Sequence, residues 1–163
     1  MADALSLSAP QKAPITVSFD IPGSATAGSP VFGDIFQNGI NAPSVNTGSV
    51  PYNEVWYLVD LDVNSSLTID MIVQLYIGTT LQAWQPDLNQ YVIGNAGRAH
   101  LSESPNYAGA IAIPANATFY MTGYLQNSNT LTTAVTESVT FQFVREPLNM
   151  AISRAKNGQS IAL

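Results

Sequence analysis

Apolar residues alternate with polar or small residues along much of the chain, with a period of two. The segment 14–22, PITVSFDIP, shows this most simply, since every second residue between its two prolines is a large apolar one. Successive side chains of a β-strand point to opposite faces, so this pattern predicts a strand with one buried face. Further strands are predicted at 31–37, 91–93 and 131–144.

The longest apolar stretch is 54–78, EVWYLVDLDVNSSLTIDMIVQLYIG. Its odd positions from 55 to 63 and from 67 to 77 are nearly all apolar, and a three-residue turn at 64–66 keeps both sets on one face. This agreement predicts a hairpin of two strands whose odd positions face the core, because a slip of one residue would expose the whole set. A second hairpin is predicted over 107–123, across the turn 114–116.

The last part of the chain differs in its spacing. In REPLNMAISRAKNG, a proline stands at a plausible helix start and a glycine at its stop, and apolar residues recur at helical intervals. A short helix over 147–156 is predicted, with a short strand as the alternative.

About eight strands are joined by turns rich in Gly, Pro and Asn, without strands and helices alternating. This predicts an all-β antiparallel sandwich, with a single jelly roll as its topology. The expected organisation is an N-terminal arm (1–13), a sandwich domain (14–146) and a C-terminal helix or arm (147–163). The N-terminal arm is either a flexible terminus or a segment that becomes ordered against a neighbouring subunit.

The even positions of the 54–78 hairpin carry acidic residues near the turn. If 63 pairs with 67, then Asp60 lies opposite Asp70, with Asp62 beside them, and the segment holds no basic residue. Three carboxylates could bind a hard cation such as calcium. Alternatively they lie at a wet sheet edge or face an arginine of a partner, since like charges across a strand pair are otherwise destabilising.

The far end of the same even face is apolar. A solvated outer face would not look like this, so either another subunit or an extra layer of the same chain is expected to cover it. The predicted interface residues combine this face with the apolar side of the helix: Trp56, Leu58, Ile72, Tyr76, Leu148 and Ile152.

Composition strengthens the expectation of an assembly. Charged residues make up only 10% of the chain and hydrophobic residues 46%, whereas charged residues are usually about 25% of a soluble domain. Net charge is −6 with five basic residues in total. Nucleic-acid binding needs a clustered basic surface, so direct binding of nucleic acid is not expected.

The chemistry-bearing residues do not indicate an enzyme. There is no cysteine, and His100 is the single histidine. His100 could join a nearby serine and Glu103 in a Ser-His-acid arrangement, but a histidine in a surface loop is the simpler interpretation. No zinc pair, nucleophile elbow or phosphate loop is present, and no cofactor is expected.

Aromatic residues offer one further possibility. Five of them could form a platform for a sugar, although aromatic residues of a sandwich usually lie in its core or an interface. The five are Tyr52, Trp56, Tyr57, Trp84 and Tyr91. The sequence shows no signal peptide and no apolar run of membrane-spanning length.

With its apolar segment 54–78, the strand TESVTFQFV (136–144), its Asn/Gly/Pro loops and its low charge, the chain resembles a family of viral proteins. These are the small single jelly-roll capsid proteins of tailless, membrane-containing icosahedral viruses of thermophilic bacteria and archaea. The resemblance extends over about 14–144 as a pattern, without a motif from which individual residues could be carried over.

The resemblance implies a structural subunit of the virion shell, made in the host cytoplasm. It also implies a dimer or higher oligomer, a second capsid protein as partner, and contact with the surface of an internal virion membrane. A carbohydrate-binding or adhesion module, such as a viral spike or fibre head, is the alternative.

Overall fold

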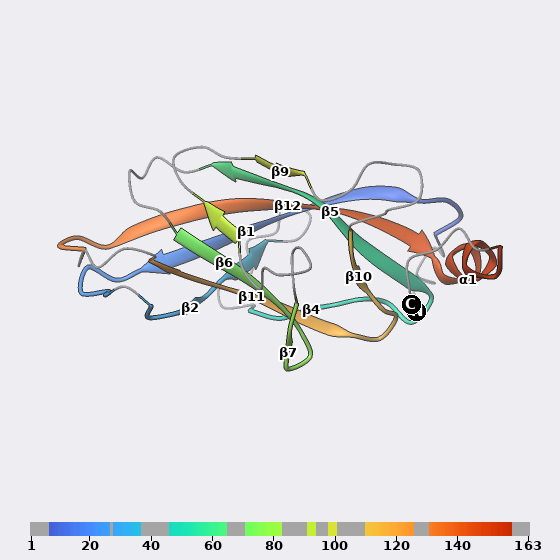
Figure 1. Ribbon diagram of the computed structural model, residues 1–163, viewed down its shortest axis with the longest axis horizontal. Helices are drawn as coiled ribbons and strands as arrows, with labels where there is room; N and C mark the ends of the chain where they lie inside the picture. The colour runs from blue at the N-terminus through green and yellow to red at the C-terminus, as the bar shows by residue number, and fades with distance from the viewer. Residues whose placement is uncertain are drawn as a thin grey trace, which may run out of the picture.

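A computed structural model describes residues 7–26, 28–36, 46–64, 71–82, 91–93, 98–100, 110–125 and 131–157. These ranges contain twelve strands and one helix. They are β1 (Gln11–Ile21), β2 (Val31–Phe32), β3 (Asp34–Phe36), β4 (Gly48–Ser49), β5 (Glu54–Asn64), β6 (Met71–Ile77), β7 (Thr80–Leu81), β8 (Tyr91–Ile93), β9 (Arg98–His100), β10 (Ile111–Ile113), β11 (Thr118–Leu125), β12 (Val135–Pro147) and α1 (Leu148–Lys156). The body is elongated, with α1 at one end of its long axis (Figure 1).

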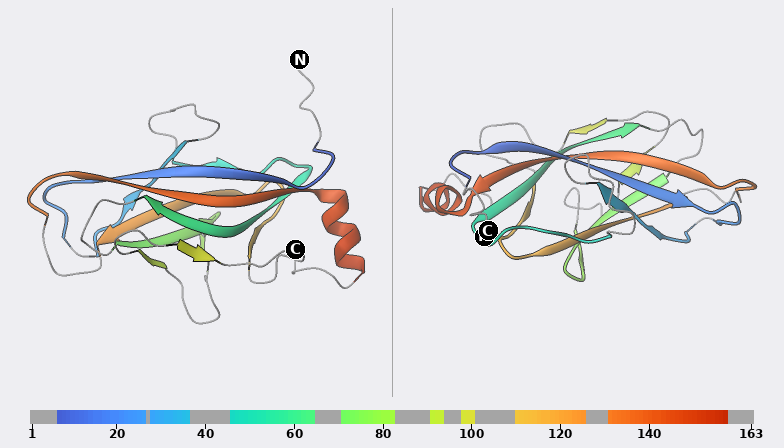
Figure 2. Two further views of the ribbon diagram at one scale, coloured as in Figure 1. Left: turned by 90° about the horizontal axis from the view of Figure 1, so that it is seen from above. Right: turned by 180° about the vertical axis from the view of Figure 1, so that it is seen from behind.

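The strands form two sheets that lie one over the other (Figure 2). The first, here called the β5 sheet, has the order β10-β5-β12-β1-β3, and β9 also pairs with β5. The second, the β6 sheet, has the order β2-β11-β6-β7, with β4 paired to β11 and β8 paired to β6. All these pairings are antiparallel, which confirms the predicted antiparallel sandwich.

The order of the strands is that of a jelly roll. If β2 with β4, β7 with β8, and β9 with β10 each count as one interrupted strand, and the short edge strand β3 is left aside, the described ranges have eight main strands. The β5 sheet then holds the sixth, third, eighth and first of them, and the β6 sheet the second, seventh, fourth and fifth. First and last strands lie side by side in the sheet, as jelly-roll winding requires.

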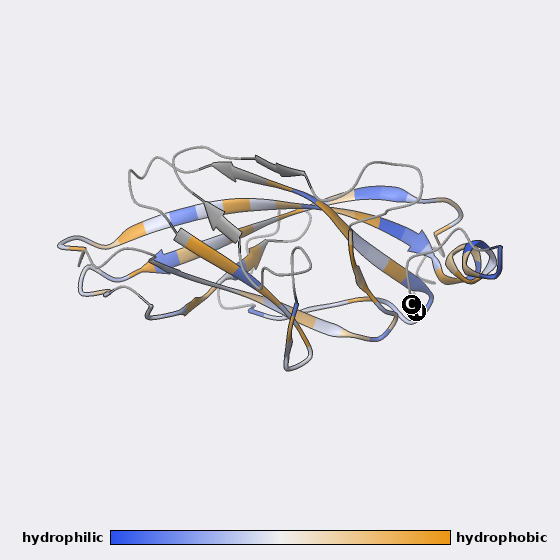
Figure 3. Cartoon of the chain, viewed as in Figure 1, coloured by the Kyte–Doolittle hydropathy of each residue, from blue (hydrophilic) through white to orange (hydrophobic). Residues whose placement is uncertain are grey.

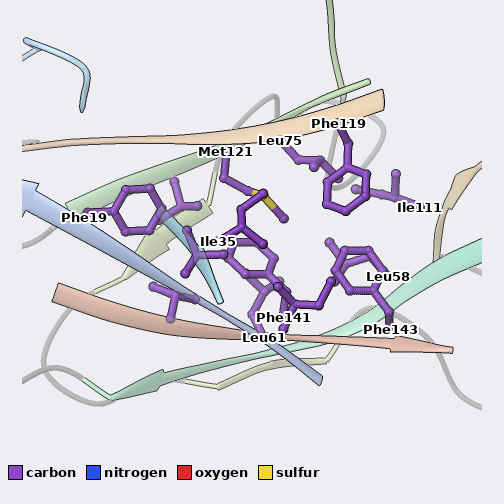
Figure 4. Packing of buried hydrophobic residues seen from close by; sticks show 14 of the residues in the cluster. Phe19, Ile35, Leu58, Leu61, Leu75, Ile111, Phe119, Met121, Phe141 and Phe143 are labelled. Atoms are coloured by element: carbon purple, nitrogen blue, oxygen red, sulfur yellow. The ribbon is translucent and has the colours of Figure 1, made fainter. Parts of the chain in front are cut away.

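Large apolar side chains from both sheets meet in one core between the layers (Figure 4). Phe19, Phe141 and Phe143 come from the β5 sheet, and Phe119 and Met121 from the β6 sheet; all are fully buried. Burying a side chain of this size stabilises the fold by roughly 1.5–3 kcal/mol. Hydrophobic and hydrophilic positions alternate along β1 and β12 (Figure 3), so the predicted inward faces of these strands are confirmed.

Both predicted hairpins are wrong, because each pair of strands is divided between the two sheets. β5 belongs to one sheet and β6 to the other, and the same holds for β10 and β11. The alternation of residues shows which face of a strand is buried, but not the sheet to which the strand belongs. Strands in opposite sheets turn their apolar sides toward the same core, so their patterns look like those of hairpin partners.

A β-bulge in β5 corrects the prediction that odd positions face the core throughout. Leu58 pairs with Phe143 and Asp60 pairs with Gln142, so Val59 is an extra residue with no partner on β12. A bulge shifts the alternation by one residue. Trp56 and Leu58 therefore face the main core before the bulge, and Leu61 faces it afterwards.

The helix α1 forms an extra layer over part of the β5 sheet. Ala151 is fully buried against Val55, Tyr57 and Ala110, with Leu148 packed beside them. The helix begins directly after Pro147, and its first N–H group, on Leu148, donates a hydrogen bond to the carbonyl oxygen of Asn53 at 2.8 Å. The helix predicted over 147–156 is thus confirmed, and it covers β5 positions that were expected to face the main core.

Candidate functional site

The acidic residues of β5 are not arranged as predicted, because β6 lies in the other sheet. Along the backbone, Asp60 is opposite His100 of β9 and Asp62 is opposite Arg98. The Asp60 carboxylate is buried and accepts a hydrogen bond from the Leu61 N–H at 3.1 Å. Asp70 lies outside the described residues. The strand pairing on which the calcium site depended is therefore absent.

Two further sequence predictions concern this region. His100 lies on a strand and not in a loop, and the neighbouring Ser102 and Glu103 fall outside the described residues. Within the described ranges, no three His, Cys, Asp or Glu side chains form a group that could hold a metal ion.

An ion pair between the buried Glu54 and the half-buried Arg145 lies at the helix end of the sandwich. Arg145 donates two hydrogen bonds to Glu54, from Nε to Oε2 at 2.8 Å and from Nη2 to Oε1 at 2.6 Å. The Trp56 indole N–H also donates to Glu54 Oε2 at 2.8 Å, and the guanidinium lies over the Trp56 ring. The hydrogen bonds from Arg145 lower the pKa of Glu54 more than burial raises it.

A second ion pair fastens α1 to the sheet. Arg154 of α1 binds the Glu146 carboxylate through Nε and Nη2, and its Nη2 donates to the Tyr57 hydroxyl oxygen at 2.8 Å. Its guanidinium also lies over the Tyr57 ring, 5.3 Å from the ring centre. Burial, with the charge of Glu146, raises the pKa of Tyr57 to about 12. These contacts hold α1 against β5 and β12.

Apolar side chains remain exposed around α1. Three of the four large apolar side chains exposed in the described part of the chain are Tyr52, Met150 and Ile152; Tyr52 is 74% exposed. Tyr52 and Ile152 line a hollow of about 420 Å³ together with Leu7 and Leu148. We call this surface the helix-end hollow.

Charge is unevenly distributed along the long axis. Lys12 and Arg145 lie near the helix end of the paired strands β1 and β12, and α1 adds Arg154 and Lys156. Two acidic residues, Glu54 and Glu146, accompany these four basic ones. In the far half of the β5 sheet, the described residues include acids at 20, 34, 62 and 137 and one base, Arg98, which lies opposite Asp62 on β9. The helix end is therefore the basic end of an acidic protein.

A second hollow, of about 410 Å³, opens on the outer face of the β6 sheet. Its described side chains come from β2, β6, β11 and Pro30 just before β2, and none of these is charged. Those that define its chemistry are Phe32, Gln74, Tyr76, Tyr120, Thr122 and Tyr124. We call it the tyrosine hollow.

The rings in the tyrosine hollow contact one another across the strands. Tyr76 and Tyr120 lie directly opposite on β6 and β11, and their rings stack in parallel with centres 4.7 Å apart. Phe32 tilts against Tyr120 at 5.7 Å. The Gln74 Oε1 accepts long hydrogen bonds from the hydroxyl groups of Tyr76 and Thr122, at 3.4 and 3.5 Å.

The six predicted interface residues have different positions. Trp56 and Leu58 belong to the main core, and Ile72 is only 4% exposed although it lies on the outer side of β6. Tyr76 and Leu148 are half-buried and line the two hollows, and Ile152 is 40% exposed. Trp56, Leu58 and Ile72 are buried within the subunit and offer little surface to a partner, and the interface itself stays a prediction.

The predicted aromatic platform does not form either. Trp56 and Tyr57 are buried in different clusters, Tyr52 is exposed at the helix end, and the side chains of Trp84 and Tyr91 fall outside the description. The tyrosine hollow was missed because its rings come from strands that are distant in sequence. The available signal in the sequence was Tyr120 and Tyr124, which lie on the other face of the strand from the core-facing Phe119 and Met121.

Comparison with known proteins adds little. No protein family model and no curated protein matches the chain. One solved structure, the crystal structure of FLHE, has a TM-score of 0.34 and 13% identity, covering 86% of this chain and 99% of that one. A likeness this weak carries no argument. In the described ranges, no helix has the length and apolar character needed to span a membrane.

Proposed function

We propose that the protein is a structural subunit of an icosahedral virus capsid, and that it associates with copies of itself through its helix end. The jelly-roll strand order supports this, because that order recurs in viral shell proteins. Lectin domains and cupins have the same architecture. The fold alone therefore does not indicate a capsid protein, and the proposal depends on the surface of the subunit.

The observation that carries it is the concentration of exposed apolar side chains beside α1. Tyr52 and Ile152 are exposed there and line a hollow together with Leu7 and Leu148, and Met150 is exposed elsewhere on α1. Apolar surface gathered in one place marks a site of association, whereas scattered apolar residues need no explanation. Contact with a neighbour would remove these side chains from water.

Charge selects the part of the neighbour that the helix end contacts. Two helix ends facing each other would bring their basic groups together. The far half of the β5 sheet, with its acidic residues, is the complementary surface. We therefore propose a head-to-tail contact, which generates rings when its rotation closes. Rings of subunits surround the symmetry axes of a shell. A second capsid protein and an internal membrane surface belong to the same proposal.

The test compares two neighbouring positions on α1. Ile152→Asp places a charge in the helix-end hollow, and Ser153→Asp places the same charge one residue away at an exposed position. We expect the parent protein and Ser153→Asp to form dimers or larger oligomers at micromolar concentrations. Ile152→Asp should remain a folded monomer, as measured by light scattering and circular dichroism.

Two results would contradict the proposal. One is a parent protein that stays monomeric up to the highest soluble concentration. The other is an Ile152→Asp variant that associates as strongly as Ser153→Asp. Electron microscopy of concentrated parent protein then shows whether the oligomers are closed rings or shells.

A further inference from the structure

The tyrosine hollow combines features that the shell proposal does not use. It lies on the outer face of the β6 sheet, whereas α1 packs on the outer face of the β5 sheet. Its volume of about 410 Å³ falls within the range of small-molecule sites, roughly 300–1,000 Å³. A ligand there would leave the helix end free.

The lining offers both apolar and polar groups to a ligand. Phe32 is 59% exposed at the rim, beside the stacked rings of Tyr76 and Tyr120. The phenol groups and the Thr122 hydroxyl can each donate or accept a hydrogen bond. Within the described part of the chain, both hydrogen bonds of Gln74 use its oxygen, so its amide N–H groups can donate to a ligand.

Charge narrows the class of ligand. None of the described residues that line the hollow is Lys, Arg, Asp or Glu, and the whole chain has a net charge of −6. An anionic ligand would meet repulsion without a compensating cation, and an organic cation would lack a carboxylate partner. Burial and the neighbouring Tyr76 raise the pKa of Tyr124, so this phenol stays uncharged at neutral pH.

The hydrogen-bonding groups of the tyrosine hollow narrow the class of ligand further. A purely apolar ligand would leave the Gln74 amide N–H groups without partners, which costs binding free energy. A sugar ring presents C–H groups on its faces and hydroxyl groups around its rim. The first can pack on the aromatic rings, and the second can bind the amide and the hydroxyl groups.

We propose that the tyrosine hollow binds an uncharged saccharide, with Phe32 and the Tyr76–Tyr120 pair contacting the sugar ring and Gln74 binding its hydroxyl groups. In a shell subunit this site would give the assembled particle a glycan-binding surface. The saccharide site is independent of the helix-end contact, so either proposal can fail without the other.

The probes are lactose, maltotriose, cellotriose and tri-N-acetylchitotriose, with sialyllactose and choline as charged comparisons. Saturation-transfer NMR with the full chain detects binding, and titration calorimetry gives the affinity. We expect at least one neutral saccharide to bind and both charged probes to give no signal that depends on the hollow.

Two variants and a matched control locate the site. Phe32→Ala removes an exposed ring from the hollow, and Tyr52→Ala removes a ring that is still more exposed from the helix end. Phe32→Ala should weaken binding roughly threefold to tenfold, the usual strength of one aromatic contact. Tyr52→Ala should leave affinity unchanged, and Gln74→Ala should weaken binding without changing the melting temperature much.

The proposal is overturned if none of the four neutral saccharides binds at millimolar concentration. It is also overturned if Phe32→Ala and Tyr52→Ala have the same affinity, or if sialyllactose or choline binds the hollow better than the neutral sugars. The oligomer mass of Phe32→Ala, measured in parallel, should equal that of the parent, which separates this result from a failure of self-association.

Discussion

At the scale of single residues, the helix end depends on two carboxylates that are buried beside arginines. Glu54 meets Arg145 and the Trp56 indole, and Glu146 meets Arg154. Removing one member of such a pair leaves a buried charge without compensation, which costs more than the intact pair contributes. These residues are therefore more important for stability than their position at the end of the sandwich suggests.

The first prediction concerns Glu54→Gln and acid. Arg145 holds the pKa of Glu54 below its ordinary value of 4.5, so the folded protein gives up this proton more readily than the unfolded chain. The pair's stabilisation is complete above pH 4.5 and is lost as the pH falls through the folded-state pKa. Glu54→Gln should lower the free energy of unfolding by about 2 kcal/mol at pH 7 and flatten the acid limb of the melting temperature.

Calorimetry from neutral to acid pH checks this prediction, and Asp20→Asn is the control. Asp20 is exposed and accepts its hydrogen bond from Thr136, which an amide oxygen can also do. This control should keep the acid limb of the parent. An acid limb of the same steepness in Glu54→Gln would show that the ion pair does not contribute through Glu54.

At the scale of the elements, β5 is the strand with the most unusual surroundings. Its first half is covered on one face by the main core and on the other by α1. A strand buried on both faces carries apolar residues without alternation. Nothing in such a segment marks the position of a bulge, and Val59 could not be recognised in the sequence for this reason.

The bulge leads to a second prediction, about deletions. Without Val59, Leu58 and Asp60 would be consecutive, as are their partners Phe143 and Gln142, so the ladder would become regular and every other β5 residue would keep its face. We expect deletion of Val59 to give a folded protein that loses about 1–2 kcal/mol, the usual cost of losing part of an apolar contact. Circular dichroism and thermal melting measure this.

Deletion of Thr140 in the adjacent strand is the matched comparison. Thr140 lies in a regular part of β12 between Val139 and Phe141. Removing it shifts one half of the strand by a residue and turns buried side chains outward. This variant should not fold. If both deletions unfold the protein, the extra residue in β5 is required for a reason other than register.

These elements show which parts of the fold could be predicted from the sequence. The inward residues of β1, β6, β11 and β12 and the helix after Pro147 could be predicted from their periodicity. The division of β5 and β6 between sheets could not, because both strands face one core. The tyrosine hollow could not either, since Phe32, Tyr76 and Tyr120 become neighbours only through strand pairing.

At the scale of the whole molecule, the subunit is polarised. Its helix end carries an excess of basic residues, and the described part of the opposite half of the β5 sheet carries more acids than bases. Exposed charges act over about 8–10 Å at physiological ionic strength. The uneven charge distribution therefore affects how fast neighbouring subunits meet and how they are oriented more than it affects the stability of one subunit.

The third prediction tests this polarity with two variants of equal net charge. Asp20→Asn removes an acid from the far half, and Ser49→Lys adds a base on the β6 sheet, so each changes the net charge by the same amount. A head-to-tail contact predicts that Asp20→Asn weakens self-association while Ser49→Lys does not. It also predicts weaker association of the parent at higher ionic strength, measured by sedimentation velocity.

If instead both variants strengthen self-association equally, general repulsion between acidic subunits controls association, and the head-to-tail arrangement is wrong. Association that strengthens with salt would favour the same conclusion, because salt then only screens repulsion.

The central position of β12 has a consequence for how the protein is made. β12 lies between β1 and β5 and pairs with both along nearly its whole length. During synthesis, β1 and β5 cannot become part of one continuous sheet until the strand between them, residues 135–147, has left the ribosome exit tunnel. Contacts so distant in sequence form slowly, and strands that wait with open edges can pair with other chains. We infer that the β5 sheet is completed only after β12 has emerged, so high expression with few chaperones should produce aggregates of chains in which β12 has not yet paired with β1 and β5.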